Sequence, residues 1–281
     1  MAVIHILPET VRSRIAAGEV IERPANVIKE LVENAIDAGS TLIRIDVSDG
    51  GKRLIRVSDN GCGMSCDDLE RSVQRHTTSK IRDEKDIDRI LTLGFRGEAL
   101  PSIASVSSMT LTSRSTDADA GWRLTLIGGI PQNRPEPAAC PTGTTIEVRD
   151  LFADMPARLK FLASAASELT RIVEWLMRLA IARPDIGFYL AANGKPRIDA
   201  PPAEHLPDRI AQLYGRPVAD ALLPVDYLNP DAGVLAAGTV PERIVGLTSA
   251  PDGGYHNRSR LLFFVNGRYI QDKKLAAAVA D

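Results

Sequence analysis

A carboxylate followed by two glycines could recognise the flat ring of a nucleotide base. Asp59 follows a predicted strand at residues 54–58, and Gly61 and Gly63 come directly after it. Asp59 could accept a hydrogen bond from an exocyclic amine while the bare glycine backbone lies close to a planar ring. Asp-Asn-Gly is also an ordinary turn sequence, so this segment alone does not decide between a base site and a simple turn.

A second group of residues offers a lining for a polyphosphate. The runs Thr77-Thr78-Ser79-Lys80 and Gly94-Phe95-Arg96-Gly97-Glu98-Ala99-Leu100 supply hydroxyls, cations and flexible backbone. Residues 97–106 are expected to begin a helix, whose free N–H groups and positive dipole end suit an anion. The chain contains neither a Gly-x₄-Gly-Lys-Ser/Thr run nor a complete dinucleotide fingerprint, which excludes the common P-loop.

Three polar residues share one side of a predicted helix at about residues 24–38. At about 100° per residue, Glu30, Asn34 and Asp37 fall within roughly 60° of one another, opposite an apolar stripe. Helical periodicity alone favours a solvated polar face for them. The base-like and phosphate-like segments that follow along the chain make a functional face the better interpretation.

The elements that must position these residues follow from periodicity and turn signals. Pro24 suits a first helical position, and Gly39 suits a left-handed helix stop. Strands at 42–47 and 54–58 are joined by an Asp-Gly-Gly turn, which predicts a hairpin. Further strands are predicted at 109–114, 122–127, 144–149, 187–192, 233–240 and 261–265, and helices at 164–182 and 273–281. The irregular stretch 59–97 is long enough to form a functional lid.

Length and composition predict a globular protein of two domains in a reducing compartment. The chain has 281 residues, 44% of them hydrophobic, and a formal net charge of −2, so binding to nucleic acid would need a local basic patch. Four prolines within residues 196–207 mark the expected boundary. The three cysteines show no repeating spacing, and Cys62, Cys66 and His76 lack a fourth ligand for a zinc site. With no expected signal peptide or membrane span, the cytoplasm is the predicted location.

The motifs together resemble the MutL family of DNA mismatch-repair ATPases, within the superfamily that also includes gyrase, Hsp90 and histidine kinases. The resemblance rests on the runs at 29–39, 59–63 and 94–100, with further matches at 143–145, 150–152, 156–161 and 264–268. It covers the chain from Ile4 to about Asp272. It implies an α/β fold: a two-layer sandwich of helices on a mixed, mainly antiparallel sheet in residues 1–203. A second α/β domain, similar to ribosomal protein S5 domain 2 and incomplete at its C-terminus, is expected in residues 204–281.

The resemblance also implies a role for individual residues. Glu30 would be the general base or water-orienting carboxylate, Asn34 the ligand of Mg²⁺, and Asp59 the acceptor for the adenine amino group. Thr144 would help at the adenine end of the site. The implied ATP-binding set comprises Asn34, Asp37, Asp59, Gly61, Gly63, Met64, Thr78, Ser79, Lys80, Gly94, Arg96, Gly97, Glu98, Ala99, Leu100 and Thr144.

The activity implied by the resemblance is an ATP-controlled clamp. Mg²⁺-ATP would close a lid at about residues 60–100, order the arm at residues 1–19 and bring two copies together as a homodimer. The clamp would bind DNA without sequence specificity and couple the mismatch-recognition protein MutS to a downstream nuclease or helicase, in the cytoplasm and on the nucleoid. The candidate DNA-binding residues are Arg158, Lys160, Arg258, Arg260, Arg268, Lys273 and Lys274.

The chain departs from the family pattern in two ways, and rival interpretations stay open. Pro101 stands where a small residue is expected, which removes one backbone donor. The family also implies a later lysine on the γ-phosphate, so we expect this chain to bind ATP and hydrolyse it poorly. A histidine kinase would need a phosphoacceptor histidine on a dimerising helix, which none of the four histidines provides. A topoisomerase, a chaperone, or a nucleotide-binding interaction module without turnover remain alternatives.

Overall fold

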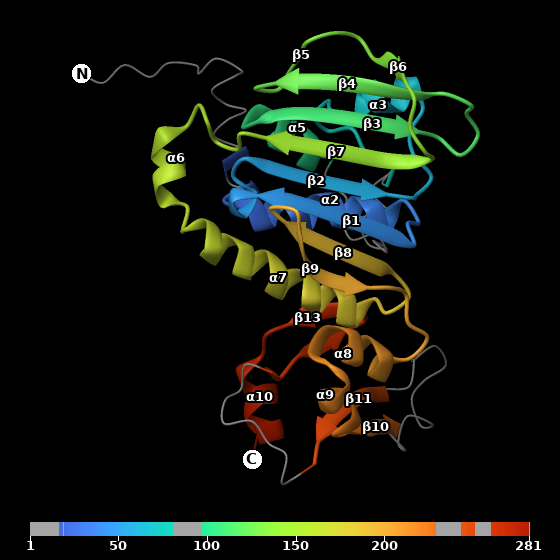
Figure 1. The fold of residues 1–281 in the computed structure, drawn as a ribbon, viewed down its shortest axis with the longest axis vertical. Helices are drawn as coiled ribbons and strands as arrows, with labels where there is room; N and C mark the ends of the chain where they lie inside the picture. The colour runs from blue at the N-terminus through green and yellow to red at the C-terminus, as the bar shows by residue number, and fades with distance from the viewer. Residues whose placement is uncertain (1–16, 19, 81–96, 229–242, 251–259, 281) are drawn as a thin grey trace, which may run out of the picture. The chain divides into compact units, whose positions relative to one another are not determined.

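The computed structural model describes residues 17–18, 20–80, 97–228, 243–250 and 260–280 (Figure 1). The predicted strand at 233–240, most of the arm, and the candidate residues Gly94, Arg96 and Arg258 lie outside the described residues. The chain divides into two compact units, one of Met1–Leu176 with Ile186–Pro201 and one of Met177–Asp185 with Pro202–Asp281. None of the described helices is long and apolar enough to cross a membrane.

The helix that carries the polar strip is α2, Pro24–Asp37, and it forms as predicted. Pro24 begins the helix, while the Asn26 side chain accepts a hydrogen bond from the Arg23 backbone N–H at 3.1 Å. Gly39 follows its end with φ of +76°. The apolar stripe is buried throughout, at Val27, Ile28, Leu31, Val32, Ala35 and Ile36. Burial of this stripe turns the opposite, polar side of α2 away from the core.

One mixed sheet forms the centre of the first unit, as the sequence predicted. Its strands run in the order β5-β4-β3-β7-β2-β1-β8-β9, with β6 paired to β4. Only the β1–β8 pair is parallel among the described strand pairs. The strands are β1 Leu42–Ser48, β2 Leu54–Asp59, β3 Ser108–Arg114, β4 Gly121–Ile127, β5 Ile130–Pro131, β6 Glu136–Ala138, β7 Gly143–Arg149, β8 Gly187–Ala192 and β9 Lys195–Ala200. The predicted β1–β2 hairpin is confirmed, with the short helix η1 (Asp49–Gly51) at its turn.

Helices cover the sheet and complete the predicted two-layer arrangement. Helix α2 packs on β2, helix α5 (Ala99–Ser105) packs on β3 and β4, and the two helices contact each other. Figure 1 shows both behind the strands. Helix α3, Cys66–Ser72, contacts β4, and it lies within the stretch that the sequence predicted as irregular. Helices α6 (Pro156–Phe161) and α7 (Ala165–Ala182) follow β7.

Strand β9 is an element that the sequence analysis did not predict. It lies inside the proline-rich stretch, and Pro196 pairs with Ala191 of β8. Because β9 is the last strand in the sheet order, the missing N–H of this proline is tolerated there. Proline therefore marks an edge strand here rather than a break in structure.

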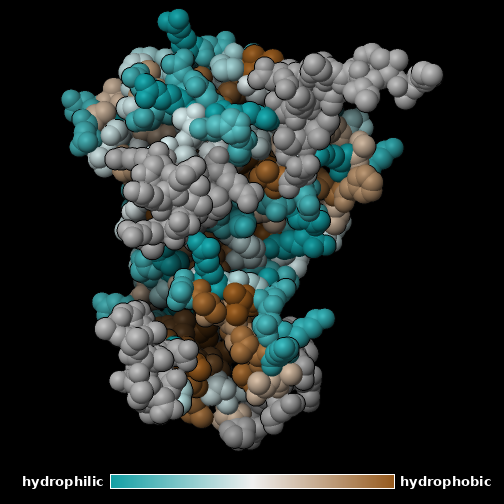
Figure 2. Space-filling model, turned by 180° about the vertical axis from the view of Figure 1, so that it is seen from behind, coloured by the Kyte–Doolittle hydropathy of each residue, from teal (hydrophilic) through white to brown (hydrophobic). Residues whose placement is uncertain are grey.

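The second unit has a small core around the end of α7. Ile181, Ile210 and Ala219 are its buried apolar residues. Its elements are α8 Leu206–Tyr214, α9 Arg216–Asp220, β10 Leu222–Leu228, β11 Arg243–Ser249, β12 Phe263–Val265, β13 Arg268–Ile270 and α10 Lys273–Ala280. Strands β10 with β11, and β12 with β13, form two separate antiparallel pairs. Figure 2 shows apolar surface, in brown, gathered on this unit.

Candidate functional site

Asp59 ends β2 and lies at the centre of a hydrogen-bonded cluster. Its Oδ1 accepts from the Ser40 hydroxyl at 3.0 Å and from the Gly61 backbone N–H at 2.8 Å. The Thr144 backbone N–H also donates to this carboxylate. Burial raises the pKa of Asp59 above its ordinary value, and the three hydrogen bonds oppose that rise. The carboxylate is thus held in place by donors from α2's end, the glycine turn and β7.

The glycine turn is fixed by contact with neighbouring backbone. Gly63 has φ of +66°, and a Cβ added there would lie 1.9 Å from the Arg114 carbonyl oxygen. From the sequence, this glycine was expected to allow the close approach of a base. In the structure the backbone at the end of β3 fills the space that a side chain would need, which explains the glycine without any ligand.

Ser113 joins the glycine turn to two strands. It lies on β3 with a fully buried side chain, and its hydroxyl accepts from the Met64 backbone N–H at 2.8 Å. The same hydroxyl donates to the Gly143 carbonyl at 3.0 Å and lies 2.9 Å from the Thr144 hydroxyl. Sequence reasoning missed both Ser113 and Ser40, because an isolated serine carries no pattern that distinguishes it.

The start of the predicted phosphate-binding segment lies on the polar side of α2. Lys80 Nζ is 2.6 Å from Asp37 Oδ2 and 2.8 Å from Asn34 Oδ1. The side chains of Lys80 and Asp37 are 17% and 7% exposed. The Lys80 backbone N–H also bonds the Thr78 hydroxyl at 3.1 Å, whereas Ser79 is exposed. The structure thus brings Lys80 to Asn34 and Asp37. Along the chain, Lys80 lies 46 residues after Asn34 and 43 residues after Asp37.

The far end of the same segment returns to this place through Gly97. With φ of +63°, Gly97 approaches Thr77 so closely that an added Cβ would lie 2.5 Å from the Thr77 carbonyl oxygen. Glu98 occupies the N-cap position of α5, and its Oε1 lies 2.8 Å from His76 Nδ1 instead of bonding the helix. The predicted helix is present, but it begins at Ala99 rather than at Gly97, whose positive φ is not helical. Pro101 is buried in the first turn of α5, and the helix continues through a bond from the Ser102 N–H to the Glu98 carbonyl.

Glu30 lies on α2 one turn before Asn34 and is half-buried. Within the part of the chain that the structure describes, neither a hydrogen bond nor an ion pair engages its carboxylate.

Glu33, which follows Glu30 on α2, was not predicted as a site residue. Burial, with the negative charges of Glu30 and Asp37 as smaller causes, raises the pKa of Glu33 to about 7, and the Lys29 and Lys80 cations oppose the rise.

The predicted adenine and phosphate clusters both contact the C-terminal end of α2. The Cys62 N–H bonds the Ala38 carbonyl at 3.0 Å, which seats the glycine turn on the residue after α2. Asn34, one turn before Ala38, and Asp37, the residue directly before it, both contact Lys80. Among the described residues no group of three or more His, Cys, Asp or Glu could hold a metal, so Cys62, Cys66 and His76 do not form one.

The candidate DNA-binding residues differ in how much of their charge is available. Arg158 donates to the Ile21 carbonyl at 3.3 Å and lies over the Phe152 ring, so it joins α6 to the residues before α2. Lys160 is exposed, next to Phe161, whose side chain is 88% exposed. In the second unit, Arg260 lies over the Tyr214 ring, while Arg268, Lys273 and Lys274 are exposed.

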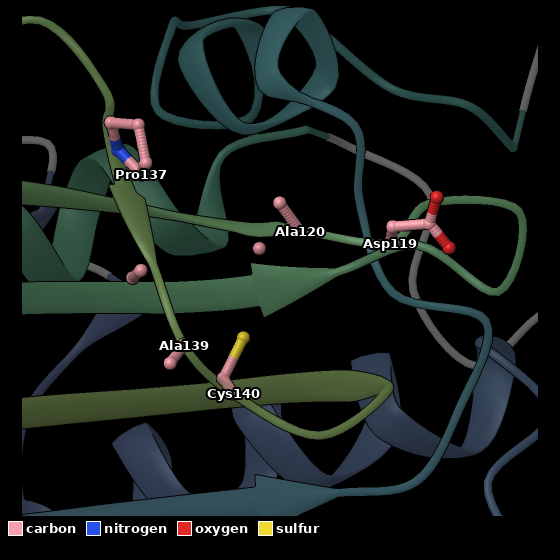
Figure 3. Close-up of a pocket in the computed structure, with 7 residues that line it drawn as sticks. Asp119, Ala120, Pro137, Ala139 and Cys140 are labelled. Atoms are coloured by element: carbon pink, nitrogen blue, oxygen red, sulfur yellow. The ribbon is translucent and has the colours of Figure 1, made fainter.

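An open pocket with a volume of ≈ 390 Å³ lies elsewhere in the first unit (Figure 3). It is lined by the residues that lead into β4, by β6 and by the chain that follows β6, including Asp119, Ala120, Pro137, Ala139 and Cys140. The Cys140 sulfur lies against Gly121, where an added Cβ would be 2.2 Å away. None of the predicted site residues lines this pocket, so it adds nothing to the candidate site.

Replacing Lys80 by methionine should destabilise the fold by about 1–3 kcal/mol, somewhat less than the loss expected for a fully buried ion pair. The Asp37 carboxylate, 7% exposed, would lose the cation 2.6 Å away. Lys29→Met is a matched control, because Lys29 is 45% exposed and 3.9 Å from Glu33, and should cost about 0–0.5 kcal/mol. Urea unfolding measures both. Equal losses for the two variants would show that Lys80 contributes no more than a surface cation.

Comparison with known proteins places this geometry in a family. Residues 22–129 match the family described as histidine kinase-, DNA gyrase B- and HSP90-like ATPases, and residues 210–281 match the C-terminal domain of DNA mismatch repair protein. The chain is 47% identical to DNA mismatch repair protein MutL of Syntrophotalea carbinolica over 278 residues, which are 99% of this chain and 43% of that protein. It is also 47% identical to MutL of Paramagnetospirillum magneticum, covering 98% of this chain and 44% of that protein.

Solved structures agree with the sequence relatives. The Aquifex aeolicus MutL ATPase domain complexed with ADP superposes with a TM-score of 0.71 at 28% identity, covering 93% of this chain and 88% of that one. The N-terminal domain of a DNA repair protein superposes with a TM-score of 0.77 at 25% identity, covering 94% and 79%. The chain spans less than half the length of the curated relatives it matches. On its ATPase motifs, its mixed sheet, both domain matches and these relatives, this chain belongs to the MutL family of DNA mismatch-repair proteins, as its ATPase region.

Proposed function

We propose that this chain binds Mg²⁺-ATP and hydrolyses it to ADP and phosphate, as the ATP-controlled clamp of a mismatch-repair protein. One observation carries the proposal: the start of the predicted phosphate segment reaches the polar side of α2, where Lys80 contacts Asn34 and Asp37. Folding thus brings together residues that are far apart in sequence, which supports a phosphate-binding end at this place. The ADP bound to the Aquifex aeolicus relative supports the same interpretation.

The donor chemistry at Asn34 fits a magnesium ion. Its amide oxygen already lies 2.8 Å from a cation, the Lys80 ammonium, and amide and carboxylate oxygens are the ligands that Mg²⁺ prefers. We assign Asn34 to the metal, which would neutralise charge on the phosphates when bound. Glu30, one turn earlier on the same side of α2, would orient the attacking water and take its proton. Ser79, Lys80, Arg96 and the backbone of residues 97–100 would close over the phosphates.

The other end of the site would hold the base. Asp59 would accept from the adenine amino group, and Thr144, whose N–H bonds Asp59, would lie beside it. Gly61, Gly63 and Met64 form the turn that carries this end. Because Asp59 is buried and already oriented by three donors, little conformational freedom is lost when the base binds.

The clamp would work through association of two copies and capture of DNA. Nucleotide binding would order the lid and the N-terminal arm, and two copies would meet around a two-fold axis. Sedimentation with and without Mg²⁺ and a non-hydrolysable ATP analogue tests this step. A nucleotide-dependent dimer supports the clamp, whereas a monomer that nevertheless binds the nucleotide would contradict it. MutS and a downstream nuclease or helicase are the proposed partners.

We also propose that the chain hydrolyses ATP slowly. Hydrolysis would distinguish an ATPase from an interaction module that binds the nucleotide without turnover. Single-turnover release of labelled phosphate, compared with nucleotide-dependent dimerisation, distinguishes these functions. Slow release that follows binding supports a weak ATPase. Dimerisation without any release supports the interaction module, and rapid release by the 281-residue chain would contradict the expected low rate.

DNA binding by the second unit should depend on the exposed cations Lys273 and Lys274. Because such binding is directed at phosphates, the affinity should fall steeply with salt and should not depend on sequence. Replacing both lysines by alanine should lower the affinity for DNA of different sequences by the same factor. The slope of the logarithm of the binding constant against the logarithm of the salt concentration should decrease in magnitude by about 1–2. Lys195→Ala, an exposed lysine on the edge strand β9, is the control. Binding that is insensitive to salt, or a loss confined to one sequence, would refute this assignment.

A further inference from the structure

Three neighbours limit how the hydroxyl of Ser113 can arrange its hydrogen bonds. A serine hydroxyl has one proton to donate and two lone pairs to accept with. The Met64 backbone N–H can only donate, and the Gly143 carbonyl can only accept. In the contact of 2.9 Å between Ser113 and the Thr144 hydroxyl, either oxygen could be the donor. When the Ser113 proton goes to Gly143, this contact uses the proton of Thr144.

This arrangement would limit what Thr144 can offer to a ligand. With its only hydroxyl proton directed at Ser113, Thr144 would have only lone pairs left for a neighbouring molecule. Its backbone N–H is directed at the Asp59 carboxylate. The two groups proposed to face the base, Asp59 and Thr144, would thus both present acceptors. Ser113 is fully buried, so water does not compete for these bonds.

We infer that Ser113 is a specificity-determining positioning residue, which directs the Thr144 hydroxyl so that the site accepts adenine and rejects guanine. The inference rests on the proposed nucleotide site and adds the origin of its base preference. Adenine carries an amino group at position 6, which donates, whereas guanine carries a carbonyl there, which only accepts. Two acceptors in the site pair with the amino group and leave the guanine carbonyl facing lone pairs.

The test compares affinities for non-hydrolysable analogues of ATP and GTP, each with Mg²⁺, by calorimetry. The parent should prefer the ATP analogue. Ser113→Ala frees the Thr144 proton to donate, so the preference should narrow about fivefold to tenfold, the size expected for one net hydrogen bond. Thr110→Val is the matched control: it removes a hydroxyl bond on the same strand, to Thr125, and should leave the preference unchanged.

A double-mutant cycle separates this role from a merely structural one. Thr144→Val removes the hydroxyl that Ser113 directs, so adding Ser113→Ala to it should narrow the preference no further. If Ser113 had only a structural role, Ser113→Ala would lower the affinities for the ATP and GTP analogues equally, and the ratio of the two affinities would not change. If Ser113→Ala does not fold, Ser113→Cys, which keeps a weak donor and acceptor, should give an intermediate ratio.

The outcomes also distinguish this inference from the proposed function. A parent that binds neither analogue would refute the proposed function itself. A parent that prefers the ATP analogue, with the same ratio in the Ser113 variants, would overturn the role of Ser113 and leave the nucleotide site standing. Additive effects of Ser113→Ala and Thr144→Val would likewise show that Ser113 does not act through Thr144.

Discussion

Glu30→Ala should lower the rate of phosphate release about 100-fold or more while leaving the affinity for the Mg²⁺-bound ATP analogue within a few-fold of the parent. A positioned general base contributes about 10²–10⁴ to a rate, and that contribution appears only in the transition state. Glu30 lies one turn from Asn34, and its carboxylate is not engaged by other described residues. Removing it therefore deletes a catalytic group without breaking a described contact.

The measurement is single-turnover release of labelled phosphate, which remains sensitive when turnover is slow. Glu22→Ala, an exposed carboxylate just before α2, serves as the control and should behave as the parent. Undiminished release by Glu30→Ala would show that another group orients the water. Loss of binding together with release would place Glu30 in nucleotide binding instead.

Asp59→Asn should lower the affinity for the ATP analogue about tenfold to 100-fold. The change replaces one carboxylate oxygen by an amide that donates, so the adenine amino group would face a donor. A hydrogen bond to a charged group contributes about 1.5–3 kcal/mol, which corresponds to this change in affinity. Calorimetry measures it, with Asp67→Asn on α3, an exposed carboxylate, as the control. Equal affinities for parent and variant would mean that the base lies elsewhere.

The same variant should show a pH-dependent difference in stability. Because burial raises the pKa of Asp59 in the folded state, the folded protein binds this proton more tightly than the unfolded chain does. The stability that the parent gains from protonated Asp59 is present below the ordinary value of 3.8 and is lost as pH rises through the raised pKa. The stability of Asp59→Asn relative to the parent should therefore increase from pH 4 to pH 7 in urea unfolding. If the difference in free energy of unfolding between Asp59→Asn and the parent stayed constant with pH, burial of the Asp59 carboxylate would not destabilise the fold as expected.

The local elements were predictable because their signals are local. Helix α2 follows from Pro24, Gly39 and a stripe that burial confirms residue by residue. The β1–β2 hairpin follows from an Asp-Gly-Gly turn between two apolar runs. The sheet order was not predictable in the same way. The parallel neighbour of β1 is β8, more than a hundred residues later, and neither strand carries a sequence signal that indicates this pairing.

The sequence assigned residues to the candidate site but could not give the contacts between them. The motifs placed Asp59, Asn34 and Lys80 in one site, whereas the ion pair between Lys80 and Asp37 depends on how the chain folds back on α2. Charge alone suggested Arg158 for DNA, but its guanidinium is used to hold the Ile21 carbonyl. Ser113 could not be predicted from the sequence. Its role comes entirely from the three partners that folding brings to its hydroxyl.

Calorimetric titration of the 281-residue chain with a non-hydrolysable ATP analogue, with and without Mg²⁺, tests whether this site binds Mg²⁺-ATP. We expect one nucleotide bound per chain, with an affinity that rises when Mg²⁺ is present, because Asn34 would hold the metal against the phosphates. The Asn34→Ala variant should lose the response to Mg²⁺ and keep the weaker metal-free binding. A folded parent that binds no nucleotide under either condition would contradict the assignment of this site to Mg²⁺-ATP.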